Sequence, residues 1–155
     1  MSKEEKYILT AVCAGEVIKL EDVCDDVFSS GILGIGFAII PESKDFLSPV
    51  DGKISNAHES GHAYVITAKN GIQVLLHIGI NTVELSGEYF SPAVKEDMTV
   101  FQGERLTYAD TEKILSRGFD PVTMTVITNP EIIDRVKITY GRVSAGETVM
   151  EYTLK

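Results

Sequence analysis

Two histidines, His62 and His77, combine a residue type and a spacing that can do chemistry together. They are two of the three histidines in the chain and lie fifteen positions apart in apolar sequence. Between them, Asn70-Gly71 is the strongest short-range signal for a β-hairpin turn. Neutral imidazole offers one lone-pair nitrogen near neutral pH, so a histidine pair can bind a metal, act as a nucleophile, or merely pack in a core.

The segment around His77 alternates as a half-buried strand does. In residues 72–80 every even position is aliphatic, whereas the odd positions include Leu75, His77 and Gly79. Successive side chains of a strand point to opposite faces, so the even face is predicted to be core. His77 is therefore predicted to point out of the main core, with its flank left open by Gly79.

The turn sets which residues face His77. A two-residue loop at Asn70-Gly71 pairs residue 69 with 72, 64 with 77 and 62 with 79. His62 then lies diagonal to His77 on one face, at the roughly 7–8 Å of diagonal neighbours. This register predicts that the two imidazoles converge on an outward face.

Three uses of such a pair compete. A histidine in a strand is most often a packed or surface residue, but convergence beside a glycine favours a site. Zinc catalysis is disfavoured because the sequence has neither H-x-H nor H-E-x-x-H, and His58 lies in a loop where it is expected to be solvated. Zn²⁺ is expected only as an ion that bridges His62 and His77 with a carboxylate from a partner or crystal neighbour, and no cofactor is expected to be required. Nucleophilic use of His77 to carry a transferable group is favoured.

The elements that position these residues are predicted to be mainly strands. Short runs rich in Val, Ile and Thr are separated by Gly, Asp, Asn and Pro throughout. Residues 100–106 and 143–149 share the pattern V-x-x-G-E-x-[LV], and residues 10–23 loosely match 47–60. This weak duplication predicts a mainly β fold, an antiparallel β-sandwich or barrel built from duplicated hairpin units with short helices.

Two short helices are predicted from capping signals. Ser91 and Pro92 have the residue types of an N-cap and a first helical position for residues 93–97. Asp110 is expected to cap a helix over 111–117 that Gly118 closes.

The whole chain bounds the class of protein. Its 155 residues, 44% of them hydrophobic, suit one domain over 1–155. The net charge of −9 makes nucleic acid an unfavourable partner and a basic protein surface a favourable one. The longest apolar stretch, 31–40, is about half the roughly 20 residues of a membrane-spanning helix, so no direct membrane insertion is expected. The N-terminus lacks a secretory signal, which favours a cytoplasmic protein, and the start at Met1 so close to the domain favours a free-standing one. Cys13 and Cys24 are expected to be ordinary thiols.

Residues 75–90, "LLHIGINTVELSGEYF", resemble the phosphorylation-site motif of glucose-family enzyme IIA domains of the bacterial phosphoenolpyruvate:sugar phosphotransferase system. That motif is an apolar pair followed by H-x-G-[IL]-D-T-V-x-L-x-G-x-x-F. Residues 27–41, 48–54, 60–63 and 120–129 are similar to further family segments, so the resemblance covers most of the chain. It implies a single IIA domain with the antiparallel β-sandwich of the duplicated hybrid motif.

The resemblance also implies a role for each site residue. His77 falls on the position that accepts a phosphoryl group, through Nε2, from the phosphohistidine of the histidine-containing carrier protein. His62 falls on the histidine that hydrogen-bonds the phosphate and helps pass it to the cysteine of a IIB domain of a sugar permease. Ser60 replaces the family threonine that orients the neighbouring imidazole. The chain is then a phosphotransferase-system component, a carrier without independent turnover, and which sugar is transported is left open.

Family partners dock on an apolar patch, and a monomer is expected. Asn81 stands where the family has an aspartate that meets an arginine of the carrier, and His58 and Asp26 replace bulky apolar residues. These departures keep an alternative open, a IIA-like regulatory module that binds enzymes or transporters and in which phosphorylation is vestigial or only a signal. A zinc peptidase of related topology is disfavoured by the missing H-x-H.

The apolar patch on which family partners dock is called the docking patch below. It comprises Val27, Phe28, Ile32, Leu33, Leu75 and Val83, with Asn81 at its edge.

Overall fold

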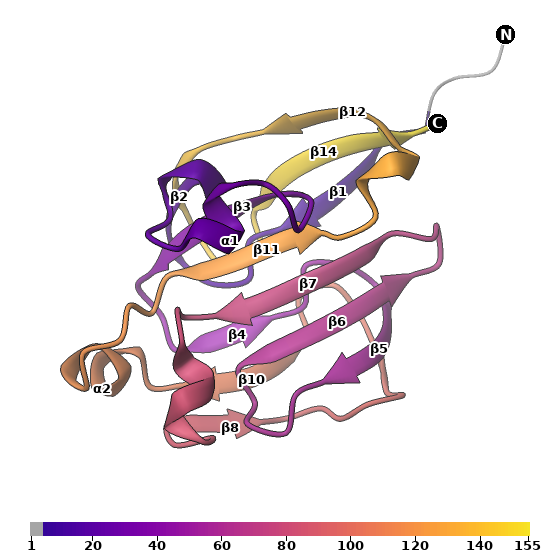
Figure 1. Ribbon diagram of the computed structural model, residues 1–155. Helices are drawn as coiled ribbons and strands as arrows, with labels where there is room; N and C mark the ends of the chain where they lie inside the picture. Colours follow the sequence, from indigo (N-terminus) through magenta and orange to yellow (C-terminus); the bar gives the residue numbers. More distant parts are fainter. Residues whose placement is uncertain (1–4) are drawn as a thin grey trace, which may run out of the picture.

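A computed structural model describes residues 5–155, and strands make up most of its regular structure (Figure 1). The helical segments are short: η1 (Leu20–Asp22), α1 (Asp26–Ser29), η2 (Thr82–Leu85), α2 (Thr111–Ser116) and η3 (Pro130–Ile132). The strands are β1 (Tyr7–Thr10), β2 (Gly15–Lys19), β3 (Ile35–Pro41), β4 (Asp45–Leu47), β5 (Gly52–Ala57), β6 (Ala63–Ala68), β7 (Gln73–Ile78), β8 (Phe90–Pro92), β9 (Thr99–Val100), β10 (Arg105–Ala109), β11 (Thr123–Ile127), β12 (Ile133–Ile138), β13 (Gly141–Val143) and β14 (Thr148–Leu154).

The strands form antiparallel sheets arranged as a sandwich, which confirms the predicted fold class. One eight-stranded sheet has the order β13-β2-β3-β11-β7-β6-β5-β9. Two three-stranded sheets, β1-β14-β12 and β4-β10-β8, pack against it. Figure 1 shows β12, β14 and β1 grouped at one end of the molecule and β10 and β8 grouped at the other. The eight-stranded sheet is thus backed by one small sheet in each half.

The two halves repeat one another, as the sequence pattern predicted. Val143 of β13 pairs with Gly15 of β2, and Val100 of β9 pairs with Gly52 of β5 in the equivalent way. Counted inward from one edge, the strands of the large sheet are β13, β2, β3 and β11, and from the other edge their counterparts are β9, β5, β6 and β7. Strands β7 and β11 therefore meet at its centre. The duplicated hairpins are β2–β3 and β5–β6.

The repeated V-x-x-G-E-x-[LV] motif forms the same turn twice. The Glu104 carboxylate accepts a hydrogen bond from the Phe101 amide at 3.0 Å, and Glu147 accepts one from the Ser144 amide at 2.7 Å. Each turn carries the chain from the large sheet into a small one, because β9 and β13 pair within the former and β10 and β14 within the latter. The motif is therefore a crossing between sheets.

The core lies between the large sheet and the small ones. The even positions of β7 point into it, and Val74, Leu76 and Ile78 are fully buried, as predicted. Burial of such a side chain stabilises the fold by about 1.5–3 kcal/mol. A second apolar cluster covers the other face of the sheet, where Phe28 of α1 packs with Met124 and Val126 of β11.

One of the two predicted helices is confirmed. Asp110 caps α2, since its carboxylate accepts a hydrogen bond from the Lys113 amide at 3.2 Å. The helix predicted over 93–97 is wrong, because Ser91 and Pro92 belong to strand β8 and a turn follows. Pairing of β8 with β10 outweighs the local capping signal, and Pro92 is tolerated because β8 is an edge strand.

Within residues 5–155, no helix has both the length and the apolar character needed to cross a membrane. Cys13 and Cys24 are free thiols, the first buried and the second exposed, as expected.

Candidate functional site

The β6–β7 hairpin carries the site, and its register differs by one residue from the prediction. Ala63 pairs with His77, whereas the sequence predicted residue 64 opposite 77. The turn contains three residues, since the Gly71 amide donates to the Ala68 carbonyl at 3.0 Å and Gly71 has φ +100°. Three-residue hairpin loops place a glycine in this left-handed conformation, which adds one residue to the expected two-residue turn.

The two imidazoles converge nevertheless. Their ring centroids lie 5.0 Å apart with the rings nearly perpendicular, at 85°. His62 precedes β6, and its carbonyl accepts a hydrogen bond from the Ile78 amide at 2.7 Å. The small side chain of Ala63 lies directly opposite His77. The predicted convergence is therefore confirmed, although His62 is 3% exposed and reaches His77 from a buried position.

Gly79 fixes the tautomer of His77. The His77 Nδ1 atom lies 2.8 Å from the Gly79 carbonyl oxygen, which can only accept, so Nδ1 carries the proton. The other ring nitrogen, Nε2, then holds the lone pair. Gly79 has φ +82°, and a Cβ there would clash with Thr82. The glycine therefore serves the backbone conformation that aims its carbonyl, a role different from the open flank that the sequence suggested.

Ser60 joins His62 to the third histidine. Its hydroxyl oxygen lies 2.5 Å from His62 Nδ1 and 2.8 Å from His58 Nδ1, and its amide donates to His58 Nδ1 at 3.1 Å. The His58 and His62 ring centroids are 4.6 Å apart. The expectation that His58 is merely solvated is thus wrong, because its ring, although exposed, is hydrogen-bonded to Ser60. The spacing H-x-S-x-H was the signal in the sequence. We call His58, Ser60, His62 and His77 the histidine cluster.

Apolar surroundings keep the inner histidines neutral. The Phe28 ring lies 5.1 Å from the His77 ring, and the Phe90 ring 6.4 Å from the His62 ring. Burial, with smaller effects of His77 and His58, lowers the pKa of His62 from 6.5 to about 4. Burial likewise lowers the pKa of His77, against the opposing effect of its bond to Gly79. Both rings are therefore neutral near pH 7 and retain a lone pair.

The docking patch is only partly on the surface. Val27, Ile32 and Val83 are 52%, 79% and 47% exposed. Leu33 and Leu75 are half-buried, and Phe28 is buried against the sheet beside His77. The structure thus presents three exposed apolar side chains over a buried support.

Asn81 is exposed but does not share the strand face of His77. Strand β7 ends at Ile78, and Asn81 has the left-handed φ of +59° at the start of η2. The strand alternation that runs through His77 therefore does not extend to this residue. Asparagine is one of the few non-glycine residues enriched in that conformation.

Among residues 5–155, no group of three or more His, Cys, Asp or Glu side chains is placed to hold a metal ion. His62 and His77 could supply two ligands to zinc, which prefers four. Any such ion would take its remaining ligands from another molecule or from water.

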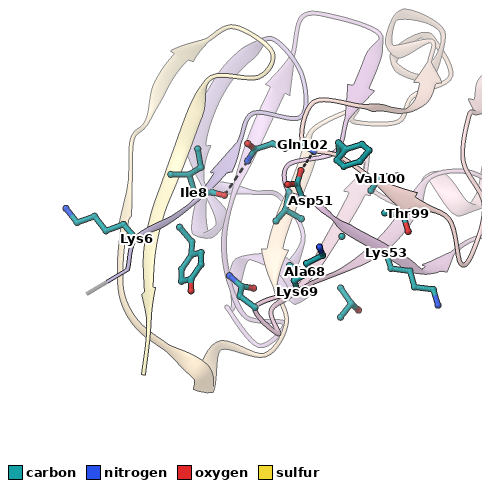
Figure 2. Close-up of a pocket in the computed structure, with 15 residues that line it drawn as sticks. Lys6, Ile8, Asp51, Lys53, Ala68, Lys69, Thr99, Val100 and Gln102 are labelled. Carbon is teal, nitrogen blue, oxygen red and sulfur yellow. Dashed lines mark hydrogen bonds between the residues drawn. The ribbon is translucent and has the colours of Figure 1, made fainter. Parts of the chain in front are cut away.

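A hollow of about 690 Å³ lies away from the histidine cluster (Figure 2). Lys6 and Ile8 line one side of it, and Lys53 and Thr99 line the other. The backbone amide of Gln102 bonds to Asp51 across its upper part. Its lining contains no histidine and no residue of the histidine cluster or the docking patch, so it is not the candidate site.

Comparison with known proteins identifies the family. Residues 7–133 match the family of the phosphoenolpyruvate-dependent sugar phosphotransferase system, EIIA 1. The chain belongs to this family, which is the phosphocarrier component of that system.

Relatives are similar over nearly the whole chain. A glucose-specific EIIA component of the phosphotransferase system from Bacillus cereus is 37% identical over 99% of this chain and 94% of its own length. The counterpart from Buchnera aphidicola is 36% identical, with 94% and 91% covered. The beta-glucoside-specific EIIBCA component from Bacillus subtilis is 40% identical over 81% of this chain, which spans only 21% of that longer protein.

A solved structure has the same fold. The glucose permease IIA from Mycoplasma capricolum superposes with a TM-score of 0.92 at 34% identity, covering 97% of this chain and 99% of that one. The resemblance, the fold class and the phosphotransferase-system function inferred from the sequence are thus confirmed.

Proposed function

We propose that His77 is the phosphoryl acceptor of this IIA domain. The observation that carries the proposal is the bond from His77 Nδ1 to the Gly79 carbonyl, which leaves the Nε2 lone pair free. Nε2 attacks the phosphorus of a donor phosphohistidine and forms a new N–P bond. The donor N–P bond breaks, and its electron pair returns to the donor imidazole. The domain is a carrier in this reaction and has a phosphohistidine intermediate.

His62 and Ser60 support the transferred group. The His62 ring lies beside His77, and its Nδ1 is hydrogen-bonded to the Ser60 hydroxyl. When that hydroxyl donates to Nδ1, the proton of the His62 ring is on Nε2, which can then donate a hydrogen bond to the phosphate. Such a donor stabilises the charge that arrives on the acceptor side and helps onward transfer. We assign His62 to orientation and transfer and not to covalent chemistry.

The proposed partners are the histidine-containing carrier protein and a IIB domain. The exposed apolar side chains of Val27, Ile32 and Val83 suit a transient protein interface. The net charge of −9 favours a basic partner surface. The name EIIBCA given to longer relatives supports a IIB partner. We place the protein in the cytoplasm, where it would meet such partners, and we expect it to be a monomer.

The test is phosphorylation in a purified system. The protein is incubated with phosphoenolpyruvate, enzyme I and the carrier protein, and mass spectrometry is expected to find one added phosphoryl group. The label is expected to be acid-labile and alkali-stable, as a phosphoramidate is. His77→Ala should take no label, whereas Gln73→Ala, at an exposed position of the same strand, should be labelled normally. Label that survives in His77→Ala would sink the assignment.

A second set of variants tests the division of roles. His62→Gln keeps a hydrogen-bond donor but cannot take up a proton, so it is expected to be phosphorylated and to pass the group on poorly to a IIB domain. Equal loss of both steps would argue against the role given to His62.

A regulatory module is the alternative, favoured by Asn81 in place of the family aspartate. Phosphate on His77 would add about two negative charges beside the docking patch, so binding to regulated enzymes or transporters would depend on phosphorylation. Phosphorylation without transfer to any IIB domain would support this alternative.

Zinc at His62 and His77 is likewise a proposal, limited to a site shared with a partner. Two imidazoles leave two positions of a tetrahedral zinc site open, and a partner's carboxylate would be a further ligand. Tight zinc binding by the isolated protein in a calorimetric titration at neutral pH would contradict it.

A further inference from the structure

His58 is connected to His62 through the hydroxyl of Ser60 and not by a direct hydrogen bond. Both rings bond through Nδ1 to the hydroxyl oxygen of Ser60, at 2.8 Å and 2.5 Å. A serine hydroxyl has one proton, so it can donate to only one of the two rings. The direction in which Ser60 donates therefore decides which nitrogen of His62 is protonated.

Two neutral arrangements of these protons exist. In the first, the Ser60 hydroxyl donates to His58 Nδ1, His62 Nδ1–H donates to Ser60, and His62 Nε2 holds a lone pair. In the second, His58 Nδ1–H donates to Ser60, Ser60 donates to His62 Nδ1, and His62 Nε2 carries the proton. Each group holds one proton in both arrangements, and exchange with water at the Nε2 atoms converts one into the other.

The backbone distinguishes the two arrangements. The Ser60 amide donates to His58 Nδ1 at 3.1 Å, and this bond requires a lone pair on that nitrogen. Only the first arrangement supplies it, because the second puts a proton on His58 Nδ1. The amide bond therefore favours the first arrangement, in which His62 cannot donate through Nε2.

We propose that His58 is a positioning residue that sets the tautomer of His62 through Ser60. It biases the unphosphorylated protein towards the His62 tautomer with a free Nε2 lone pair. Because a phosphate on His77 requires an Nε2–H donor, arrival of the phosphate must reverse this bias. His58 thereby makes the phosphorylated form less stable relative to the donor and readier to pass its group on. This consequence rests on the proposed function, whereas the tautomer itself does not.

The decisive measurement is the tautomer of His62 in unphosphorylated protein, read from its ¹⁵N chemical shifts. His58→Leu removes the ring and the acceptor of the Ser60 amide. It is expected to shift the tautomer ratio of His62 towards Nε2–H by roughly five-fold, the factor for one ordinary hydrogen bond. His58→Asn keeps an acceptor oxygen two residues before Ser60, as in an Asx turn, and should retain the wild-type ratio.

Two outcomes overturn the proposal. One is an unchanged His62 tautomer in a His58→Leu protein whose amide spectrum shows the native fold. The other is the same shift in His58→Leu and His58→Asn, which would mean that loss of any ring has the effect. A role of His58 in docking alone would raise the KM for the carrier and leave the ¹⁵N shifts in place, so it belongs to the first outcome.

A second experiment measures how the phosphoryl group is shared between this protein and the carrier. In equilibrium with the phosphorylated carrier, His58→Leu is expected to hold roughly five-fold more phosphoryl group relative to the carrier than wild type or His58→Asn, for the same reason. Absence of label in every protein would remove the proposed function, yet a shifted tautomer in His58→Leu would still uphold the inference about His58.

Discussion

At the scale of single residues, burial keeps His62 neutral at a cost that depends on pH. In the unfolded chain His62 takes up a proton near its ordinary pKa of 6.5, whereas in the folded protein it does so near 4. Between these values the unfolded state binds more protons than the folded state. The free energy of unfolding therefore rises with pH through this window.

The first prediction is that acid lowers the free energy of unfolding through protonation of His62. The contribution of His62 is fully present above pH 6.5 and is lost as the pH falls towards 4. At about 1.4 kcal/mol per pKa unit, the loss in the free energy of unfolding is about 3 kcal/mol. Urea unfolding at several pH values measures it, with His62→Gln as the control that should weaken the dependence. Parallel pH profiles for the two proteins would show that His62 is not its source.

The second prediction concerns Gly79. Its left-handed φ and the nearness of Thr82 mean that Gly79→Ala adds both backbone strain and a steric clash. Gly118→Ala is the matched control, since Gly118 also has a left-handed φ, of +87°, but a Cβ there would meet nothing within 4 Å. The strain alone costs about 1–2 kcal/mol.

Urea unfolding should therefore rank Gly79→Ala as clearly more destabilised than Gly118→Ala. Phosphorylation should also slow in Gly79→Ala only, because the carbonyl that fixes the His77 tautomer moves. Equal losses of stability with unchanged phosphorylation would mean that Gly79 serves only the turn.

At the scale of elements, what the sequence could predict depended on how local each cause is. Alternation along 72–80 predicted β7 and its buried face because the periodicity is contained in the strand itself. The register was missed by one residue because Asn70-Gly71 is compatible with both two-residue and three-residue turns. Strand β8 was missed because it is stabilised by pairing with β10, a long-range contact that capping residues do not reveal. The H-x-S-x-H spacing makes the bond of His58 to Ser60 possible, but the bond also needs the loop conformation before β6, which spacing does not define.

The third prediction belongs to the two crossing turns. Glu104 and Glu147 each accept a hydrogen bond from the amide three residues earlier, so the duplication predicts similar energies. Glu104→Ala and Glu147→Ala should each lower the free energy of unfolding by about 1 kcal/mol. Glu96→Ala, at an exposed loop position, controls for the loss of one negative charge. A large loss of unfolding free energy for one variant and none for the other would show that the two turns share a geometry but do not contribute equally to stability.

At the scale of the whole molecule, the duplication places His77, the acceptor that we propose, on a central strand. His77 is paired on one side with Ala63 of β6 and on the other with Met124 of β11. A strand paired on both sides leaves its backbone little freedom, so the imidazole is held where the chain turns at Gly79. Rigid placement of a nucleophile lowers the entropic cost of transfer. The fold thus fixes the position of the His77 imidazole, while the histidine cluster determines which ring nitrogens carry protons.

The last prediction combines the net charge of −9 with the exposed edge of the docking patch. Asn81→Asp introduces the carboxylate that the family resemblance implies at this position, and it would attract an arginine of the proposed carrier partner but repel a phosphate on His77. We expect the attraction to prevail, because docking precedes transfer and because Asn81 does not share the strand face of His77. A partly exposed pair contributes about 0.2–1 kcal/mol and acts mainly on association.

Phosphorylation of Asn81→Asp should therefore be up to roughly five-fold faster at low salt, and the gain should shrink as salt screens the charges. Rates of gain and loss of label, measured for both proteins at two ionic strengths, test this. A shorter life of the phosphorylated form, without faster gain, would mean that repulsion prevails. Asn81→Ser, which removes the amide without adding charge, is the control, and an equal rate increase there would show that the carboxylate is not the cause.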